Sequence, residues 1–192
     1  MEISANFKWN GIRKYKFAIH PVTFFRLSRL TIRLNKKEYH SAVNCFSDGL
    51  YRFAVKLTKS ESLAQDLVQS AFEKVWIKKD NIQAEKVKSY LFRTVFNQFL
   101  DDKKRNKVVS LEEYHKEASF LPESCDLKTV LNLALSSLAP IQKSALLLRD
   151  YEGYSYNEIG EILELSPSQV KVYIYRARKQ LQKYIGSLEK VI

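Results

Sequence analysis

The chain has 192 residues, 45% of them hydrophobic and 28% charged, which indicates a folded core and argues against a disordered chain. It contains only five glycines and four prolines, so a sheet-rich fold with many turns is disfavoured and an all-α fold is expected. No stretch reaches the roughly 18 uninterrupted apolar residues of a membrane-spanning helix, so we expect no membrane insertion.

Residues 1–37 differ in composition from the rest of the chain. They hold nine Lys and Arg side chains and one acid, Glu2, whereas residues 38–192 carry a net charge of only +3. Between Ile19 and Leu34, arginines interrupt the apolar residues, and no small-residue cleavage site of a secretory signal is present. A basic amphipathic helix on a membrane or on nucleic acid is one interpretation. We favour a disordered tail or an artefactual extension, and in the second case natural translation would begin at Leu34.

The cysteine and histidine residues do not indicate a metal site. Cys45 and Cys125 cannot make a disulfide framework or a zinc ligand set, and the three histidines lack ligand spacing. Cys45 lies in an apolar helical stretch and is expected to be a core thiol. This pattern fits a reducing cytosol. We therefore expect a cytoplasmic protein with no metal and no cofactor.

Residues 38–107 are expected to form the first of two small helical domains. From Tyr39 to Leu57, apolar residues recur at spacings of three and four, which is the period of an amphipathic helix. A second helix is predicted to open at Ser62, where Gln65 completes a capping box. Its apolar face holds Leu63, Leu67, Phe72, Val75 and Trp76, and its other face holds Asp66, Gln69, Ser70, Glu73 and Lys74.

A third helix is predicted over roughly residues 86–105. Two apolar rows run along it, and Tyr90 and Asn97 lie among them. Aromatic rings beside cations are typical of single-stranded nucleic-acid binding, because bases stack on rings while cations follow the backbone. Core aromatics beside a solvated basic face are the other interpretation, which this pattern alone favours. The basic residues at the end of the helix are Lys103, Lys104, Arg105 and Lys107.

A linker is expected between two domains. Residues 106–126 lose helical periodicity and collect acidic and small polar residues. We expect a flexible connection over 108–126 that leads into a second domain over 127–188. The second domain is predicted to begin with helices over about 127–138 and 141–151.

Local signals then predict a helix-turn-helix. Gly153 can take the left-handed turn that ends a helix. Ser155 and Glu158 form a capping box at the start of a short helix, and a three-residue turn follows it. Ser166 caps the last helix, with proline at the first helical position and Gln169 closing another capping box. Two short helices joined in this way are typical of DNA-binding proteins.

The last helix is predicted to be the recognition helix. Its N-terminal residues would meet base edges in the major groove, and its basic residues would contact phosphates. Residues 171–192 contain six basic residues and one acid. A helical hairpin with a solvated basic face is the alternative. The predicted contact residues are Ser168, Gln169, Lys171, Val172, Tyr173, Tyr175, Arg176, Arg178 and Lys179.

Three blocks of sequence stand in a distinctive order along the chain. They are Leu50–Ala54 with Ala64–Trp76, then Tyr90–Asn97 with Asp101 and Arg105, then Tyr151–Gly160 with Arg176–Arg178. In this order, over residues 38–188, the chain resembles the extracytoplasmic-function (ECF) sigma factors of bacterial RNA polymerase. The first block resembles their polymerase-binding region, the second the region that reads the −10 element, and the third the helix-turn-helix that reads the −35 element.

The resemblance implies a role for each block and no enzymatic activity. Asp66, Gln69 and Glu73 would dock on the clamp region of the largest subunit of core RNA polymerase. The predicted recognition helix would read the −35 element of promoter DNA. An anti-sigma factor that covers these surfaces would be a further partner. The residues implied for the −10 element are Tyr90, Arg93, Asn97, Lys103, Lys104 and Arg105.

Four positions depart from the family pattern. The family usually has Glu where Ser70 stands, so one clamp contact is in doubt. It often lacks an insertion such as Ala139 between leucine and proline. A basic residue is common at the position of Tyr173, which puts the −35 preference in doubt. Gly160 replaces a usual alanine and should cost up to about 1 kcal/mol of helix stability.

The sequence leaves two other function classes as alternatives. A free-standing DNA-binding regulator would use the same helix-turn-helix, with residues 38–105 as an effector or dimerisation domain, and would bind duplex DNA without polymerase. A helical enzyme is disfavoured, because no nucleophile–base pair, phosphate-cradling glycine loop or paired carboxylates form a plausible site.

Overall fold

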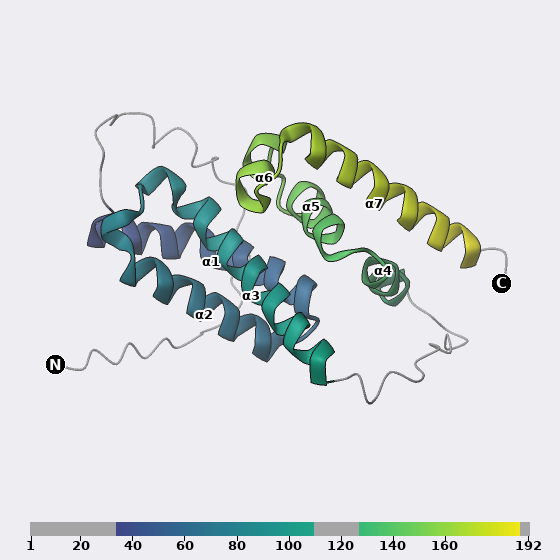
Figure 1. Cartoon of the computed structure of the whole chain (residues 1–192), viewed down its shortest axis with the longest axis horizontal. Helices are drawn as coiled ribbons and strands as arrows, with labels where there is room; N and C mark the ends of the chain where they lie inside the picture. The colour runs from purple at the N-terminus through teal and green to yellow at the C-terminus, as the bar shows by residue number, and fades with distance from the viewer. Residues whose placement is uncertain (1–33, 110–126, 189–192) are drawn as a thin grey trace. The chain divides into compact units, whose positions relative to one another are not determined.

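The computed structural model describes residues 34–109 and 127–188. Within these residues the chain forms seven α-helices and two short 3₁₀ helices and contains no strand (Figure 1). The all-α prediction is therefore confirmed. All of the described residues belong to one compact unit.

Three long helices pack against one another in the first part of the chain. They are α1 (Lys36–Thr58), α2 (Glu61–Ile77) and α3 (Val87–Val109), and the 3₁₀ turns η2 (Lys79–Asn81) and η3 (Ala84–Lys86) connect α2 to α3. Each helix contacts the other two, as their apolar spacing predicts. The largest side chains that they bury together are Leu50, Phe53, Leu91 and Phe92.

The folded chain starts before the first helix that the sequence pattern indicated. Leu34 is only 2% exposed, and its N–H donates to the carbonyl oxygens of Lys79 and Ile82. Asn35 then caps α1 in a reciprocal capping box with Glu38. The four residues before Glu38 are thus part of the folded unit. The earlier part of the predicted N-terminal extension lies outside the described residues.

The predicted start of α2 is wrong by two residues. The N-cap is Ser60 rather than Ser62, and the Ser60 hydroxyl oxygen accepts from the Leu63 N–H at 3.3 Å. The reason lies in the preceding residue, because Lys59 has a left-handed φ of 60° that ends α1 abruptly. The chain is therefore free to begin a new helix at once.

Two side chains that the sequence assigned to the core lie at the surface. Cys45 is exposed, because helical geometry turns it away from the stripe of α1 that faces α2 and α3. Trp76 is 38% exposed at the end of α2. Its ring centroid is 4.9 Å from that of Tyr39, and Lys79 Nζ lies 4.3 Å from the Trp76 ring centroid. A surface aromatic cluster therefore replaces the expected core contact.

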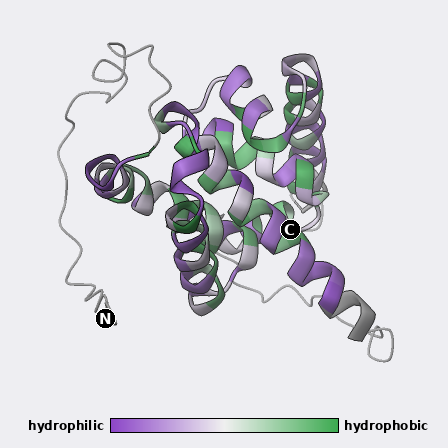
Figure 2. Cartoon of the chain, turned by 60° about the vertical axis from the view of Figure 1, so that its left-hand side comes forward, coloured by the Kyte–Doolittle hydropathy of each residue, from purple (hydrophilic) through white to green (hydrophobic). Residues whose placement is uncertain are grey.

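Four helices form the second part of the chain. They are α4 (Leu127–Ser136), α5 (Pro140–Asp150), α6 (Tyr156–Leu163) and α7 (Pro167–Leu188). Helix α7 contacts the other three, and Gly153 has the expected left-handed φ of 73° after α5. Figure 2 shows hydrophobic residues gathered where helices face one another. The buried side chains of this part include Leu147, Leu148, Ile159, Ile162, Val170, Ile174 and Ala177.

The predicted helix-turn-helix is confirmed by its cap geometry. Ser155 and Glu158 form the capping box at the start of α6. Glu164 ends α6 with a left-handed φ of 58°. At the start of α7 the Ser166 N–H donates to Gln169 Oε1 at 2.8 Å, and the Gln169 N–H donates to Ser166 Oγ at 3.3 Å. These local bonds fix the turn between the two helices.

Gly160 has a packing role that helix propensity does not reveal. A Cβ atom at this position would lie 2.5 Å from the backbone oxygen of Leu165. The Leu165 N–H also donates to the Gly160 carbonyl oxygen at 2.9 Å. Glycine at this position therefore has two effects. It lowers helix stability, as expected, and its missing side chain lets the turn close against α6.

Contacts join the two sets of helices along α1–α5 and α3–α6. Arg52 of α1 donates to both carboxylate oxygens of Glu152, at 2.7 and 3.1 Å.

Of the predicted linker, residues 108 and 109 are the last residues of α3, and residues 110–126 lie outside the described residues.

Candidate polymerase and nucleic-acid interface

The outer face of α2 carries the residues expected to bind polymerase. Asp66, Gln69 and Glu73 are all exposed, and their spacing of three and four places them along one side of the helix. Within the described part of the chain, neither Asp66 nor Glu73 forms an ion pair with a basic side chain. This face is therefore polar, acidic and available to a partner.

Ser70 does not share that exposed face. Its side chain is half-buried, and its hydroxyl oxygen accepts from Gln98 Nε2 at 2.6 Å. The serine thus ties α2 to α3 where the family usually has a glutamate. The departure from the family pattern has a packing consequence here, because a longer acid would displace this hydrogen bond.

The residues expected to read the −10 element lie along α3. Tyr90, Arg93 and Asn97 follow one another at helical spacing, and Asn97 is exposed. Tyr90 is half-buried, with Lys78 Nζ 6.0 Å from its ring centroid. Helical spacing therefore places these three side chains on one side of α3, with Tyr90 next to the C-cap residue of α2, Lys78.

The basic side chains along α3 and the turn before it form a stripe, and those in its first half, Lys86, Lys88 and Arg93, are engaged by α6 and its C-cap residue Glu164. Arg93 Nη1 lies 2.8 Å from Glu164 Oε1, and Arg93 Nη2 donates to the backbone oxygen of Glu161. Lys86 Nζ lies 3.0 Å from Glu161 Oε2, and Lys88 pairs with Glu158. The hydrogen bond from Lys86 lowers the pKa of Glu161, which keeps that carboxylate ionised. None of these ion pairs is visible in the sequence, because about 70 residues separate the partners.

The second half of the stripe pairs within its own helix. Lys104 Nζ is 3.8 Å from Asp101, and Arg105 forms an ion pair with Asp102. Lys103 is exposed and forms no ion pair with any described residue. The predicted basic cluster at the end of α3 is thus partly neutralised by its neighbours one turn away.

The predicted recognition helix presents a more open surface. Tyr175 is 64% exposed and Val172 is 44% exposed. Lys171, Arg176 and Lys179 are also exposed, and among the described residues none of them forms an ion pair. This face combines cations for phosphates with apolar and aromatic groups that can contact bases.

Four of the residues predicted to contact the −35 element also make contacts within the protein. Ser168 and Gln169 both bond to the cap residue Ser166, with Gln169 using its carbonyl oxygen, so the amide nitrogen of Gln169 remains a donor. Tyr173 is half-buried and packs against the core. Arg178 donates to both carboxylate oxygens of Asp150, at 2.6 and 3.2 Å, and so ties α7 to α5.

One basic residue on the open face was missed by the sequence analysis. Lys183 is exposed and lies one turn beyond Lys179, on the same side of α7. The spacing of Val172, Arg176, Lys179 and Lys183 at four, three and four residues carries this signal. Extending the periodic count past Lys179 would have identified it.

In residues 34–109 and 127–188, no group of three or more His, Cys, Asp or Glu side chains is placed to hold a metal ion. None of the helices described is long and apolar enough to cross a bilayer.

Two family models match the two sets of helices. Residues 42–108 match Sigma-70 region 2, and residues 129–181 match Sigma-70, region 4. The first range spans most of α1 through α3, and the second contains the helix-turn-helix.

Curated relatives and solved structures agree with these matches. The chain is 32% identical over 150 residues to the ECF RNA polymerase sigma factor SigE of Mycolicibacterium smegmatis, covering 73% of this chain and 58% of that protein. It is 30% identical to the RNA polymerase sigma-E factor of Streptomyces coelicolor, covering 76% of this chain and 85% of that protein. It also resembles the sigma factor RpoE in a complex with the anti-sigma factor NepR from Bartonella quintana, at a TM-score of 0.64 and 26% identity, over 78% of this chain and 98% of that one. The fold of CnrH, solved with the cytosolic domain of CnrY, matches at a TM-score of 0.61 and 22% identity, over 80% of this chain and 90% of that one.

Proposed function

Because this chain belongs to the ECF family of RNA polymerase sigma factors, which direct polymerase to promoters, we propose that three exposed helix faces divide this work. The outer face of α2 binds core polymerase, the exposed side of α3 reads the −10 element, and the open face of α7 reads the −35 element. We further propose that residues 38–107 and 127–188 act as separate domains during initiation, joined by a linker over 108–126.

Polymerase binding is assigned to Asp66, Gln69 and Glu73. The assignment is supported by their exposure on one side of a helix inside the Sigma-70 region 2 match and by the absence of ion pairs at the two acids within the described chain. The proposed partner surface is the clamp region of the largest polymerase subunit. Exposed carboxylates on a helix would meet a basic partner surface and guide its approach.

Reading of the −10 element is assigned to the stripe on α3. Tyr90 and Asn97 would contact an unpaired base of the melted strand, and Arg93 would contact the adjoining backbone. Arg93 must exchange its bonds to α6 for phosphate oxygens in this role. The cations assigned to the backbone further along α3 are Lys103, Lys104 and Arg105.

The observation that carries the proposal is the open face of α7. Lys171, Arg176 and Lys179 are exposed without ion pairs among the described residues, directly after a helix-turn-helix whose caps are in place. A recognition helix needs this combination, because base edges are read near its N-terminus and phosphates along its length. Val172 and Tyr175 would add apolar contacts to the major groove, where thymine presents a methyl group.

Further features of the proposal follow from the family. The protein would act in the cytoplasm, where the polymerase works, and would catalyse no reaction itself. An anti-sigma factor is proposed as a partner, since the RpoE structure that this chain resembles at 26% identity is a complex with NepR.

The test of the polymerase surface uses charge reversal on α2. The double variant Asp66→Lys/Glu73→Lys in the full chain should lose at least about tenfold in affinity for core polymerase, because two acids at a partner surface become repulsive. Binding to duplex DNA should be unaffected or slightly stronger. The affinities are measured by pull-down titration with purified core enzyme and by electrophoretic mobility shift.

The matched control for that test is Glu85→Lys. Glu85 is an exposed acid in η3, outside the proposed surface, and forms no ion pair with a described residue. It should leave polymerase affinity within about twofold of wild type. Equal loss in control and double variant, or no loss in either, would remove α2 from the polymerase interface.

A further inference from the structure

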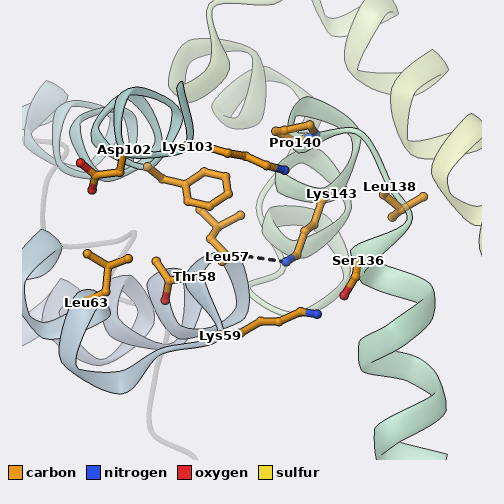
Figure 3. Close-up of a pocket in the computed structure, with 11 residues that line it drawn as sticks. Leu57, Thr58, Lys59, Leu63, Asp102, Lys103, Ser136, Leu138, Pro140 and Lys143 are labelled. Carbon is orange, nitrogen blue, oxygen red and sulfur yellow. Dashed lines mark hydrogen bonds between the residues drawn. The ribbon is translucent and has the colours of Figure 1, made fainter. Parts of the chain in front are cut away.

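A pocket of about 280 Å³ lies where the end of α1 and the second half of α3 meet α4 and α5 (Figure 3). Three lysines line it, namely Lys59, Lys103 and Lys143, and a single carboxylate, that of Asp102, lines it with them. Figure 3 shows the three ammonium groups at one side of the pocket, with that of Lys143 between those of Lys59 and Lys103, and the Asp102 carboxylate directed away from them. The Asp102 carboxylate forms an ion pair with Arg105.

Lys143 is the unusual member of this group. It is only 6% exposed, and its Nζ donates to the backbone oxygen of Leu57 at 3.2 Å. An ammonium group has three N–H donors, so this bond satisfies one of them. In the described part of the chain Lys143 forms no ion pair with a carboxylate. A buried cation without a counter-charge is energetically unfavourable.

The other lysines make this environment more positive. Burial, followed by the charges of Lys59, Lys103 and Lys56, lowers the pKa of Lys143 to about 8. Lys59 is fixed at the pocket by the left-handed turn that ends α1. The ammonium groups are thus brought together by the fold without an acid of the described chain to balance them.

The two hydroxyl groups that line the pocket already donate to backbone oxygens. Thr58 Oγ1 donates to the backbone oxygens of Ala54 or Ser60, and Ser136 Oγ donates to the backbone oxygen of Asn132. A ligand would therefore find positive charge as the main attraction. It would also have to be small, since the volume lies just below the range for ligand pockets, roughly 300–1,000 Å³.

We propose that this pocket is a binding site for a small phosphate-class anion, of the size and charge of a diphosphate. Several acceptor oxygens on a compact anion can meet three ammonium groups at once, and lysine binds phosphate as a point charge. The bound anion would supply the counter-charge that Lys143 lacks. This assignment does not depend on the proposed role in transcription.

Binding has a consequence for the contact between the two sets of helices. Lys59 and Lys103 lie within the region 2 match, whereas Lys143 lies within the region 4 match. An anion held by all three stabilises the state in which α5 contacts α1, because a ligand stabilises the state to which it binds.

The experiment titrates inorganic pyrophosphate into the full chain. Isothermal calorimetry and thermal unfolding are run at pH 7.5, with ionic strength held constant by sodium chloride. We expect saturable binding and a rise in Tm that follows the same dissociation constant. The double variant Lys59→Gln/Lys103→Gln should bind at least about tenfold more weakly, since it removes two of three charged contacts.

A matched control separates a built site from general charge attraction. Lys36→Gln/Lys74→Gln removes the same charge from two exposed lysines outside the pocket and should keep wild-type affinity. Lys143→Met should lose binding as well, and if it fails to fold, the other two variants decide. No saturable binding to wild type, or equal weakening by both double variants, would overturn the proposal.

Discussion

The two helices with proposed DNA contacts, α3 and α7, differ in how their basic side chains are engaged. On α3, Arg93 is held by the Glu164 carboxylate and by the backbone oxygen of Glu161, and Arg105 is held by an acid of its own helix. On α7, Arg176 and Lys179 are exposed without ion pairs among the described residues, and only Arg178 is bound, to Asp150. Arg176 and Lys179 of α7 are therefore ready to meet phosphates, whereas Arg93 and Arg105 of α3 must first exchange partners.

This difference shows that counting basic residues does not locate a nucleic-acid surface. Exposed ion pairs contribute about 0–1 kcal/mol each, so the pairs on α3 can be exchanged at low cost. Phosphate contacts also release counterions from DNA, which favours the exchange at low salt. The availability of each cation, rather than its presence, separates the two helices.

The largest effect on DNA binding is expected from substituting arginines on α7, where Arg176 and Arg178 can be compared. Arg176→Ala should lower the affinity of the sigma factor–polymerase complex for promoter DNA by about 5- to 150-fold, as expected for loss of a contact worth roughly 1–3 kcal/mol. Arg178→Ala should cost clearly less, because that guanidinium is already committed to Asp150. Promoter affinity measured by mobility shift for both variants tests the contrast. Equal losses would contradict the distinction between free and engaged cations.

The tight turn between α6 and α7, which positions the open face of α7, can be tested by substituting Gly160. Gly160→Ala should destabilise the protein by about 1–3 kcal/mol, because a Cβ would overlap the backbone of the turn. Gly186→Ala is the control on α7, where nothing lies within 4 Å of a Cβ, and it should stabilise by up to about 1 kcal/mol. Urea unfolding gives both values. A stabilising Gly160→Ala would mean that helix propensity outweighs the close contact.

The free energy of unfolding should depend on pH, because Lys143 is buried where the two sets of helices meet. Its pKa is lowered from 10.5 to about 8 on folding, so between these values the unfolded chain binds more protons. The free energy of unfolding should therefore rise with pH across this window, by roughly 1.4 kcal/mol for each unit of pKa difference at most. Urea unfolding of wild type and Lys143→Met from pH 7.5 to 10 isolates the effect. A constant difference between the two proteins would contradict the inferred burial of charge.

The smallest effect is expected from the acids that hold α3. Glu161→Gln/Glu164→Gln should strengthen the binding of single-stranded −10 DNA to the polymerase complex by about two- to fivefold, in line with exposed pairs worth less than 1 kcal/mol. The matched control is Glu85→Gln, which removes a nearby exposed acid that has no ion pair with a described residue. Fluorescence anisotropy with a labelled oligonucleotide measures the change. Weaker binding by the double variant would indicate that the α6 acids support the −10 surface.

Local chemistry explains which features the sequence could predict. The caps at Ser155 and Ser166 depend on residues three positions apart, and the structure has both. The start of α2 was missed because a left-handed residue, Lys59, ended the preceding helix. Helix spacing identified the core but misassigned Cys45 and Trp76, whose side chains are exposed.

Long-range pairing explains what the sequence could not predict. Arg93 and Arg178 each bind an acid on another helix, so their engagement depends on tertiary packing. The burial of Lys143 depends on the contact of α5 with the end of α1. Family resemblance identified the helices expected to meet polymerase and DNA. It gave no information about which of their side chains the fold already uses.

The most direct test of the account is reconstituted transcription. The full chain is combined with purified core RNA polymerase, and run-off transcripts are mapped on a library of promoter fragments from the same genome. We expect stable binding to core enzyme and initiation from fragments that share a pair of spaced elements, with both lost in Asp66→Lys/Glu73→Lys. Binding to duplex DNA without any binding to core polymerase would contradict it and indicate a free-standing regulator instead.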